Sequence, residues 1–358
     1  MDPQQPPDGG PRSQVSPAAR VGAAVRRSVP GLGLAVAVAG ASLLVARLLP
    51  AAPAPVLVAM LLGLLIGNVA SLPATLEPGL ALASKRVLRL GVVLLGARLT
   101  IADVASIGGS ALWVVVVCMA VAVLTVIVLA RLAGTPPRLA TLIAVGTAVC
   151  GNTAIMAVAP VIRARDREVS FAVATITIFG TSALLLFPMV GTVAGMSGEV
   201  FGFWAGLAIN DTSQVVAAGA AHSAEALDVA TVVKLVRNAL MAPVLLLLAW
   251  WTHRTTTPSR DPGSGDARGS ALRAFPAFLL GFLALVALRS VGILDAGAGE
   301  VVGEAATLLI TVAIASVGLR TRISGLRRVG LRPFLVGFGA AVALAAVGLA
   351  FARWLGMP

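Results

Sequence analysis

Long runs of apolar residues, separated by short polar or glycine- and proline-rich stretches, follow one another from residue 31 to residue 355. A helix needs about 20 mainly apolar residues to cross the hydrocarbon core of a bilayer. The pattern therefore predicts an all-α polytopic membrane protein with about 11 transmembrane helices. The predicted spans are 31–49, 54–70, 85–99, 110–132, 138–162, 168–192, 200–220, 227–251, 272–294, 302–320 and 333–355.

The composition fits a chain that has lipid as its solvent. Apolar residues make up 58% of the 358 residues and charged residues 12%, with a mean hydropathy of +0.97. A soluble domain carries about 25% charged residues. Residues 1–30, rich in Pro, Gly and Arg, predict a disordered cytoplasmic tail, and 31–358 is expected to form the transmembrane transporter domain. The run Gly31–Leu49 is longer than a signal-peptide core, so we expect an uncleaved first helix.

The net charge of +12 comes from arginines that lie between the apolar runs, not along one face. This placement excludes a nucleic-acid-binding surface and follows the positive-inside rule. It predicts a multi-pass protein of the cell (cytoplasmic) membrane with its N-terminus in the cytoplasm.

One basic cluster, at 163–167, breaks the rule, because eleven continuous spans would place it outside the cell. If 138–162 and 200–220 are instead re-entrant hairpins, the cluster moves to the cytoplasmic side and the other loops keep theirs. We favour eleven spans because both segments are long enough to cross. The re-entrant alternative stays open.

The first candidate site interrupts the span 138–162 at Cys150, Gly151, Asn152 and Thr153. Glycine weakens a helix, while Asn and Thr favour the start of a new one. A broken helix inside the membrane exposes N–H groups and the positive end of a half-helix dipole, which together suit an anion. The alternative is a local kink whose polar side chains bond a neighbouring helix.

The second candidate site is a run of five polar residues, Asn210, Asp211, Thr212, Ser213 and Gln214, inside the span 200–220. A charge near the bilayer centre costs at least about 2.5–3.5 kcal/mol on insertion scales, so it usually has a partner or a function. We therefore expect Asp211 to carry a coupling proton or ion. A helix-capping role for Asn210 or Asp211 is compatible with this.

A third segment places Lys234 and Arg237 on one face of the span 227–251, because residues three apart are neighbours on a helix. Lys234 either extends to the headgroups or pairs with Asp211 or with substrate. Buried, it could also titrate and take part in proton coupling. We expect Lys234 and Arg237 to offset the charge of a bound anion.

Enzymatic chemistry finds no support in the sequence. His222 and His253 are isolated, and Cys118 and Cys150 lie in apolar runs. No metal-ligand spacing, phosphate loop or serine elbow occurs. We expect no enzyme activity, no cofactor and no metal.

The motifs together resemble the YeiH-type membrane proteins, a family associated with sulfate export. The resemblance rests on Cys150–Ile155, on Ile209–Gly219 and on the run from Val233 to Arg237, and it covers nearly all of the chain after the tail. It implies an inner-membrane carrier distantly similar in fold to the sodium/proton antiporters and bile-acid symporters, with inverted repeats and discontinuous helices. The repeats would be 54–192 and 200–355, with broken helices at 138–162 and 302–320. Some members carry His at the position of Asn210, so a histidine mechanism is not expected here.

The leading hypothesis is a secondary transporter of a small anion, such as sulfate or another sulfur oxyanion or sulfonate, working by alternating access. Its partners would be the anionic solute, the lipid bilayer and a coupling proton or sodium ion; a homo-oligomer is compatible with the sequence. One alternative is a cation/proton antiporter that uses Asp211. Another is a membrane sensor or scaffold that transports nothing.

Overall fold

The computed structural model describes residues 17–48, 54–241, 243–248, 277–321 and 331–354, and these residues form helices and connections without a strand. The expectation of an all-α protein is confirmed. The elements are α1 (Pro17–Leu48), α2 (Pro55–Val69), η1 (Ala74–Leu76), α3 (Glu77–Leu82), η2 (Ala83–Val87), α4 (Leu88–Leu95), η3 (Gly96–Arg98), α5 (Ile101–Ala133), α6 (Pro137–Ala148), α7 (Asn152–Val158), α8 (Asp166–Val193), α9 (Gly198–Ala208), α10 (Thr212–His222), α11 (Ala224–Ala239), α14 (Ala277–Ser290), α15 (Ala296–Arg320) and α16 (Leu331–Trp354).

Within these residues, six helices are long and apolar enough to cross a membrane, and α2 and α14 are shorter apolar helices. The six are 26–48, 101–133, 166–193, 224–248, 296–320 and 331–354. Residues 77–98 form a further helical rod in which α3, η2, α4 and η3 follow without a break. If the two hairpins described below are each counted as one membrane segment, a total of about eleven segments is compatible with this architecture.

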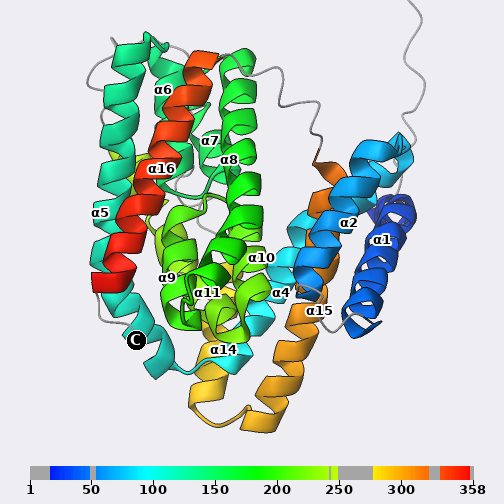
Figure 1. The fold of residues 1–358 in the computed structure, drawn as a ribbon. Coiled ribbons are helices and arrows are strands. Elements are labelled where there is room, and N and C mark those ends of the chain that lie inside the picture. Colours follow the sequence, from blue (N-terminus) through cyan, green and yellow to red (C-terminus); the bar gives the residue numbers. More distant parts are fainter. Residues whose placement is uncertain (1–16, 49–53, 242, 249–276, 322–330, 355–358) are drawn as a thin grey trace, which may run out of the picture.

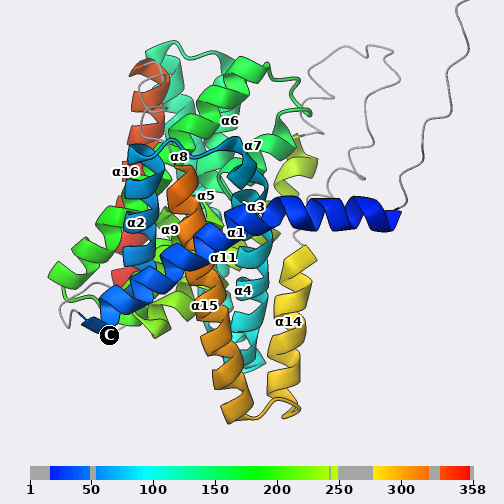
Figure 2. The ribbon, with the colours of Figure 1, turned by 90° about the vertical axis from the view of Figure 1, so that its right-hand side faces the viewer.

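The helices form two bundles, which stand side by side in Figure 1 and are seen from another side in Figure 2. One bundle contains α1 to α4, α14 and α15, and its centre is the contact of α2 and α4 with α15. Glycines allow backbones to touch there: a Cβ on Gly63 would lie 2.5 Å from the carbonyl oxygen of Ala315. The other bundle contains α5 to α11 and α16. Helix α10 contacts α2 and α15, so it lies where the bundles meet.

The chain turns back between α6 and α7. A Cβ on Gly146 would lie 2.9 Å from Cδ1 of Ile155, although a continuous helix would separate residues nine apart by roughly 13 Å along its axis. Helix α8 then begins near the end at which α6 began, at the top of the second bundle in Figure 1. Residues 137–158 therefore form a re-entrant hairpin.

Helices α9 and α10 form a second hairpin, which lies in the lower half of the same bundle in Figure 1. The ring of Phe201, near the start of α9, stacks on the ring of His222, the last residue of α10, with 4.2 Å between centroids. A continuous helix would place these two residues roughly 30 Å apart. The two hairpins thus enter the bundle from opposite ends.

Our preference for continuous spans at 138–162 and 200–220 was therefore wrong, and the re-entrant alternative holds. Both segments are long enough to cross, but each is divided into two short helices that double back. The reversal places the loop before α8 at the same end of the bundle as the connection between α5 and α6. The basic cluster at 163–167 therefore no longer opposes the charge pattern.

Two further expectations need correction. The segment 302–320 is not broken: it lies inside the continuous helix α15, where Thr307 and Thr311 donate to carbonyls one turn earlier in the helix and no Gly-Asn pair interrupts it. Helix α1 begins at Pro17, so part of the predicted tail 1–30 is helical, with proline at the first position, where its missing N–H costs nothing. Residues 1–16 lie outside the described part, and the repeat boundaries stay a prediction.

Candidate functional site

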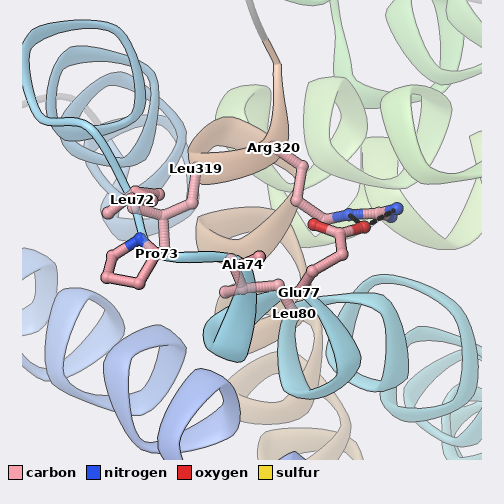
Figure 3. Close-up of a pocket in the computed structure, with 7 residues that line it drawn as sticks. All are labelled: Leu72, Pro73, Ala74, Glu77, Leu80, Leu319 and Arg320. Atoms are coloured by element: carbon pink, nitrogen blue, oxygen red, sulfur yellow. Dashed lines mark hydrogen bonds and ion pairs between the residues drawn. The ribbon is translucent and has the colours of Figure 1, made fainter.

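A surface cavity of about 220 Å³ lies between the 72–74 connection, α3 and the end of α15. Figure 3 shows that the carboxylate of Glu77 and the guanidinium of Arg320 meet across its rim, 2.6 Å apart. These two charges neutralise each other. The cavity contains none of the residues predicted for a site, so the candidate site lies elsewhere.

The tips of the two hairpins meet inside the second bundle. Gly151 forms the first tip with a φ of +64°, a conformation that favours glycine, and a Cβ there would lie 3.4 Å from the carbonyl of Asn210 in the second tip. The predicted segments 150–153 and 210–213, which are about 60 residues apart in sequence, are thus adjacent in space.

Lys234 of α11 joins the two tips. Its side chain is 0% exposed, and its Nζ donates to the carbonyls of Val149 and Ile209, each at 3.1 Å, and to that of Asn210. It therefore does not extend to the headgroups. Within the described residues no ion pair joins it to Asp211, and its partners are the carbonyl groups at the ends of α6 and α9.

Arg237, one turn further along α11, also joins the two tips, by donating hydrogen bonds to five carbonyls. Its guanidinium donates to Ala148 at 2.8 Å, Leu207 at 2.6 Å, Ile209 at 3.2 Å and Gly206 at 3.5 Å, and also to Thr147. The last carbonyls of a helix have no partner within the helix and carry about half a negative charge. Lys234 and Arg237 therefore neutralise the C-terminal ends of both α6 and α9.

The N-termini of α7 and α10 at the tips differ in whether a side chain caps them. Helix α7 starts at Asn152, and Gly151 before it provides no side-chain cap. Helix α10 is capped by Asp211, whose carboxylate accepts from the N–H of Ser213 at 2.9 Å and from its hydroxyl at 2.6 Å. Asp211 thus has the capping role left open above. The N-terminus of α7 keeps its positive end without a counter-charge from a cap.

The remaining predicted residues divide by exposure. Thr153 is exposed and Thr212 half-buried, so both line the accessible side of the tips. Cys150 is buried, with its Sγ 3.4 Å from the Sδ of Met241. Its thiol therefore belongs to the packing behind the tip, and Gly151, not Cys150, provides the break.

Three polar residues that bond to the tips, Thr177, Thr181 and Asn238, were not among the predicted site residues, and Gln214 was predicted only as part of the polar run. Asn152 donates to the hydroxyl of Thr177 at 3.1 Å, and Gln214 donates to the hydroxyl of Thr181 at 3.3 Å. Asn238 similarly donates to Thr212 at 3.2 Å on the α11 side. The four-residue spacing of Thr177 and Thr181, which places two hydroxyls on one face of α8, could have indicated them.

Comparison with known proteins decides the family. The family model described as Conserved hypothetical protein 698 matches residues 30–337. The chain belongs to this family. Its relatives, called UPF0324 membrane proteins, include one from Corynebacterium glutamicum, 38% identical over 83% of this chain and 84% of its own, and one from Nitratidesulfovibrio vulgaris, 34% identical over 91% and 93%.

A UPF0324 protein named TauZ from Paracoccus denitrificans is 36% identical over 78% of this chain and 81% of its own length. No solved structure matches the chain. The resemblance seen in the motifs is therefore confirmed at the level of the UPF0324 family, and like its relatives this chain is a multi-pass membrane protein.

Proposed function

We propose that this UPF0324 protein is a secondary transporter of a small anion, and that the anion binds where the two hairpin tips meet. The observation that carries the proposal is the pairing of Lys234 and Arg237 with the C-terminal carbonyls of both hairpins. This pairing cancels the negative helix ends and leaves the uncapped N-terminus of α7 beside them.

The charges at the tips favour an anion. Lys234 and Arg237 contribute two positive charges, Asp211 one negative charge, and each helix end about half a charge of its own sign. Because two C-termini and two N-termini meet, the helix ends cancel and the sum is about +1. A net positive charge held away from water attracts a small anion.

The two-bundle architecture supports alternating access. The hairpins and α11 belong to one bundle, and α10 is the element that contacts α2 and α15 of the other. A movement between the bundles would open the tips to one side of the membrane and then to the other, around a site of fixed geometry. The loops with Arg131, Arg138 and Arg163 would face the cytoplasm of the cell, in agreement with the positive-inside rule.

The proposed substrates are sulfur oxyanions and sulfonates. The name TauZ of the Paracoccus relatives hints at a link to taurine, an aminosulfonate. We propose no catalytic role, because a transporter site needs to bind and release without changing a bond.

The test is exchange of labelled sulfate, sulfite and taurine by the purified protein in liposomes. We expect saturable exchange of at least one of these solutes. Asn152→Asp should reduce exchange at least about tenfold, because a carboxylate would occupy the positive helix end. Thr192→Ala on α8, whose hydroxyl only bonds the carbonyl of Pro188, is the matched control and should exchange normally.

Two results would contradict the proposal: no flux of any small anion by folded protein, or wild-type exchange by Asn152→Asp. The sensor or scaffold hypothesis predicts the first result. The cation antiporter hypothesis predicts proton-linked cation flux without anion exchange.

A further inference from the structure

A group of four polar side chains lies where both hairpins contact α8. Asn152 from the first hairpin and Gln214 from the second reach toward Thr177 and Thr181, which lie one turn apart on α8. We call these four residues the α8 polar cluster. Gly180 makes room for it, since a Cβ there would lie 1.9 Å from Oε1 of Gln214.

The cluster has oxygen atoms without hydrogen-bond partners. Each amide group uses its nitrogen to donate to a threonine hydroxyl, and Oδ1 of Asn152 and Oε1 of Gln214 are left buried and unpaired. Gln214 is 4% exposed. Buried polar groups are almost always paired, and an unpaired oxygen inside a membrane protein is costly. These oxygens are therefore available to bind a ligand that accepts their lone pairs.

Neutral oxygens in this number suit a small monovalent cation. Together the two amides and two hydroxyls present four oxygen atoms from three different helices, without a carboxylate among them. Rings of neutral oxygens replace the hydration shell of sodium and potassium ions in membrane proteins. A divalent ion would call for carboxylates.

The surroundings of the cluster separate it from the anion site. Helix α8 packs against α6, α7, α10 and α16, while Lys234 and Arg237 approach the tips from α11, which packs against α5, α9 and α10. The side chains of Lys234 and Arg237 thus bind the carbonyls at the C-terminal helix ends and do not bond to the cluster. An anion at the tips would supply negative charge near the cluster.

We infer that the α8 polar cluster is a binding site for a sodium-like monovalent cation. Because Asn152 belongs both to the cluster and to the tip of α7, the cation would fix the side chain next to the anion. Occupancy of one site would then favour occupancy of the other. This coupling rests on the proposed transport function, whereas cation binding itself does not.

The test is the thermal stability of the purified protein in detergent, titrated with NaCl against choline chloride at equal ionic strength. A ligand that binds only the folded protein raises its Tm. We expect a saturable rise with sodium and none with choline. Thr181→Val, which keeps the size of the side chain but removes the hydroxyl, should raise the half-saturating sodium concentration at least about tenfold, as should Gln214→Ala.

The matched control is Thr175→Val on the same helix, because Thr175 bonds the carbonyl of Phe171 and packs against Gly337 of α16. It should respond to sodium like the wild type. If Thr181→Val and Gln214→Ala do not fold, Gln214→Glu decides: it keeps the oxygen and adds negative charge, so it should bind sodium at least as tightly.

Several outcomes would overturn the inference: no sodium-specific rise in the wild type, an unchanged response in Thr181→Val, or loss of the response in folded Gln214→Glu. A Tm that follows sulfate and not sodium would also overturn it, since the amides would then present their NH2 groups. Sodium binding without anion flux would support the cation site and contradict the proposed transporter, so the two failures are distinguishable.

Discussion

Lys234→Met offers a direct test of how the hairpin tips are held. The change keeps an unbranched side chain of similar length and removes the three hydrogen bonds from Nζ to the carbonyls of Val149, Ile209 and Asn210. Hydrogen bonds between helices in membrane proteins contribute about 0.6–1.7 kcal/mol each. Three of them give about 2–5 kcal/mol, so the variant should release the tips well before the rest of the protein unfolds.

The two cysteines provide the assay, because both are free and buried. Cys150 is in the first tip, directly after Val149, whereas Cys118 is in the middle of α5. With each factor of ten equal to about 1.4 kcal/mol, a loss of 2 kcal/mol should speed labelling of Cys150 by a thiol reagent about 30-fold. Labelling of Cys118 should change much less.

Lys85→Met is the matched control, because Lys85 is the other lysine of the chain and its side chain is exposed. It should leave the labelling rates of both cysteines unchanged. Equal acceleration at Cys118 and Cys150 in Lys234→Met would indicate global destabilisation, and no acceleration at Cys150 would refute the idea that Lys234 holds the tip.

Three further predictions concern other parts of the site and the contact between the bundles. Asp211→Asn keeps an oxygen that can cap α10, so the anion model predicts continued anion exchange that no longer depends on a proton gradient. The exchange is measured in liposomes with and without an imposed pH difference. Complete loss of ion binding would favour the cation antiporter instead. Gly151→Ala should lower stability by about 1–2 kcal/mol, measured as Tm, because alanine is strained at the positive φ of this position. A Tm equal to wild type would contradict the geometry of the tip. Arg98 of η3 and Asp228 of α11 form an ion pair across the two bundles, with 3.7 Å between their charged atoms. Arg98→Glu should therefore slow exchange, and the double variant Arg98→Glu/Asp228→Arg should restore part of the rate. Equal defects in the single and the double variant would argue against a direct pair.

The sequence pattern predicted where the helices are interrupted but not the direction in which the chain continues. The Gly151–Asn152 pair and the polar run at Asn210–Gln214 are poor in a continuous membrane helix, and both positions are indeed breaks. Whether the second half-helix continues or turns back depends on a few backbone dihedrals, such as φ +64° and ψ −126° at Gly151. Length alone favoured crossing, whereas the charge of the 163–167 loop pointed to the hairpin.

The hydrogen-bond partners of Lys234 and Arg237 could not be predicted from the sequence either. Spacing placed Lys234 and Arg237 on one face of a helix, and this is confirmed because both contact the same two hairpins. Their partners are backbone carbonyls, which every residue carries and no sequence motif marks. The partners of Asn152 and Gln214 on α8 required knowledge of how the hairpins pack, because the threonines lie more than 20 residues from one amide and more than 30 from the other.

The shared attachment of both hairpins to α11 has a mechanical consequence. Neither tip can leave the other without leaving several buried carbonyls unpaired, and each unpaired carbonyl would cost folding free energy. We therefore expect the hairpins and α11 to travel as a single rigid body that slides past α2 and α15, carrying its solute in the manner of an elevator. The surface of α10 that contacts α2 and α15 would be the sliding plane.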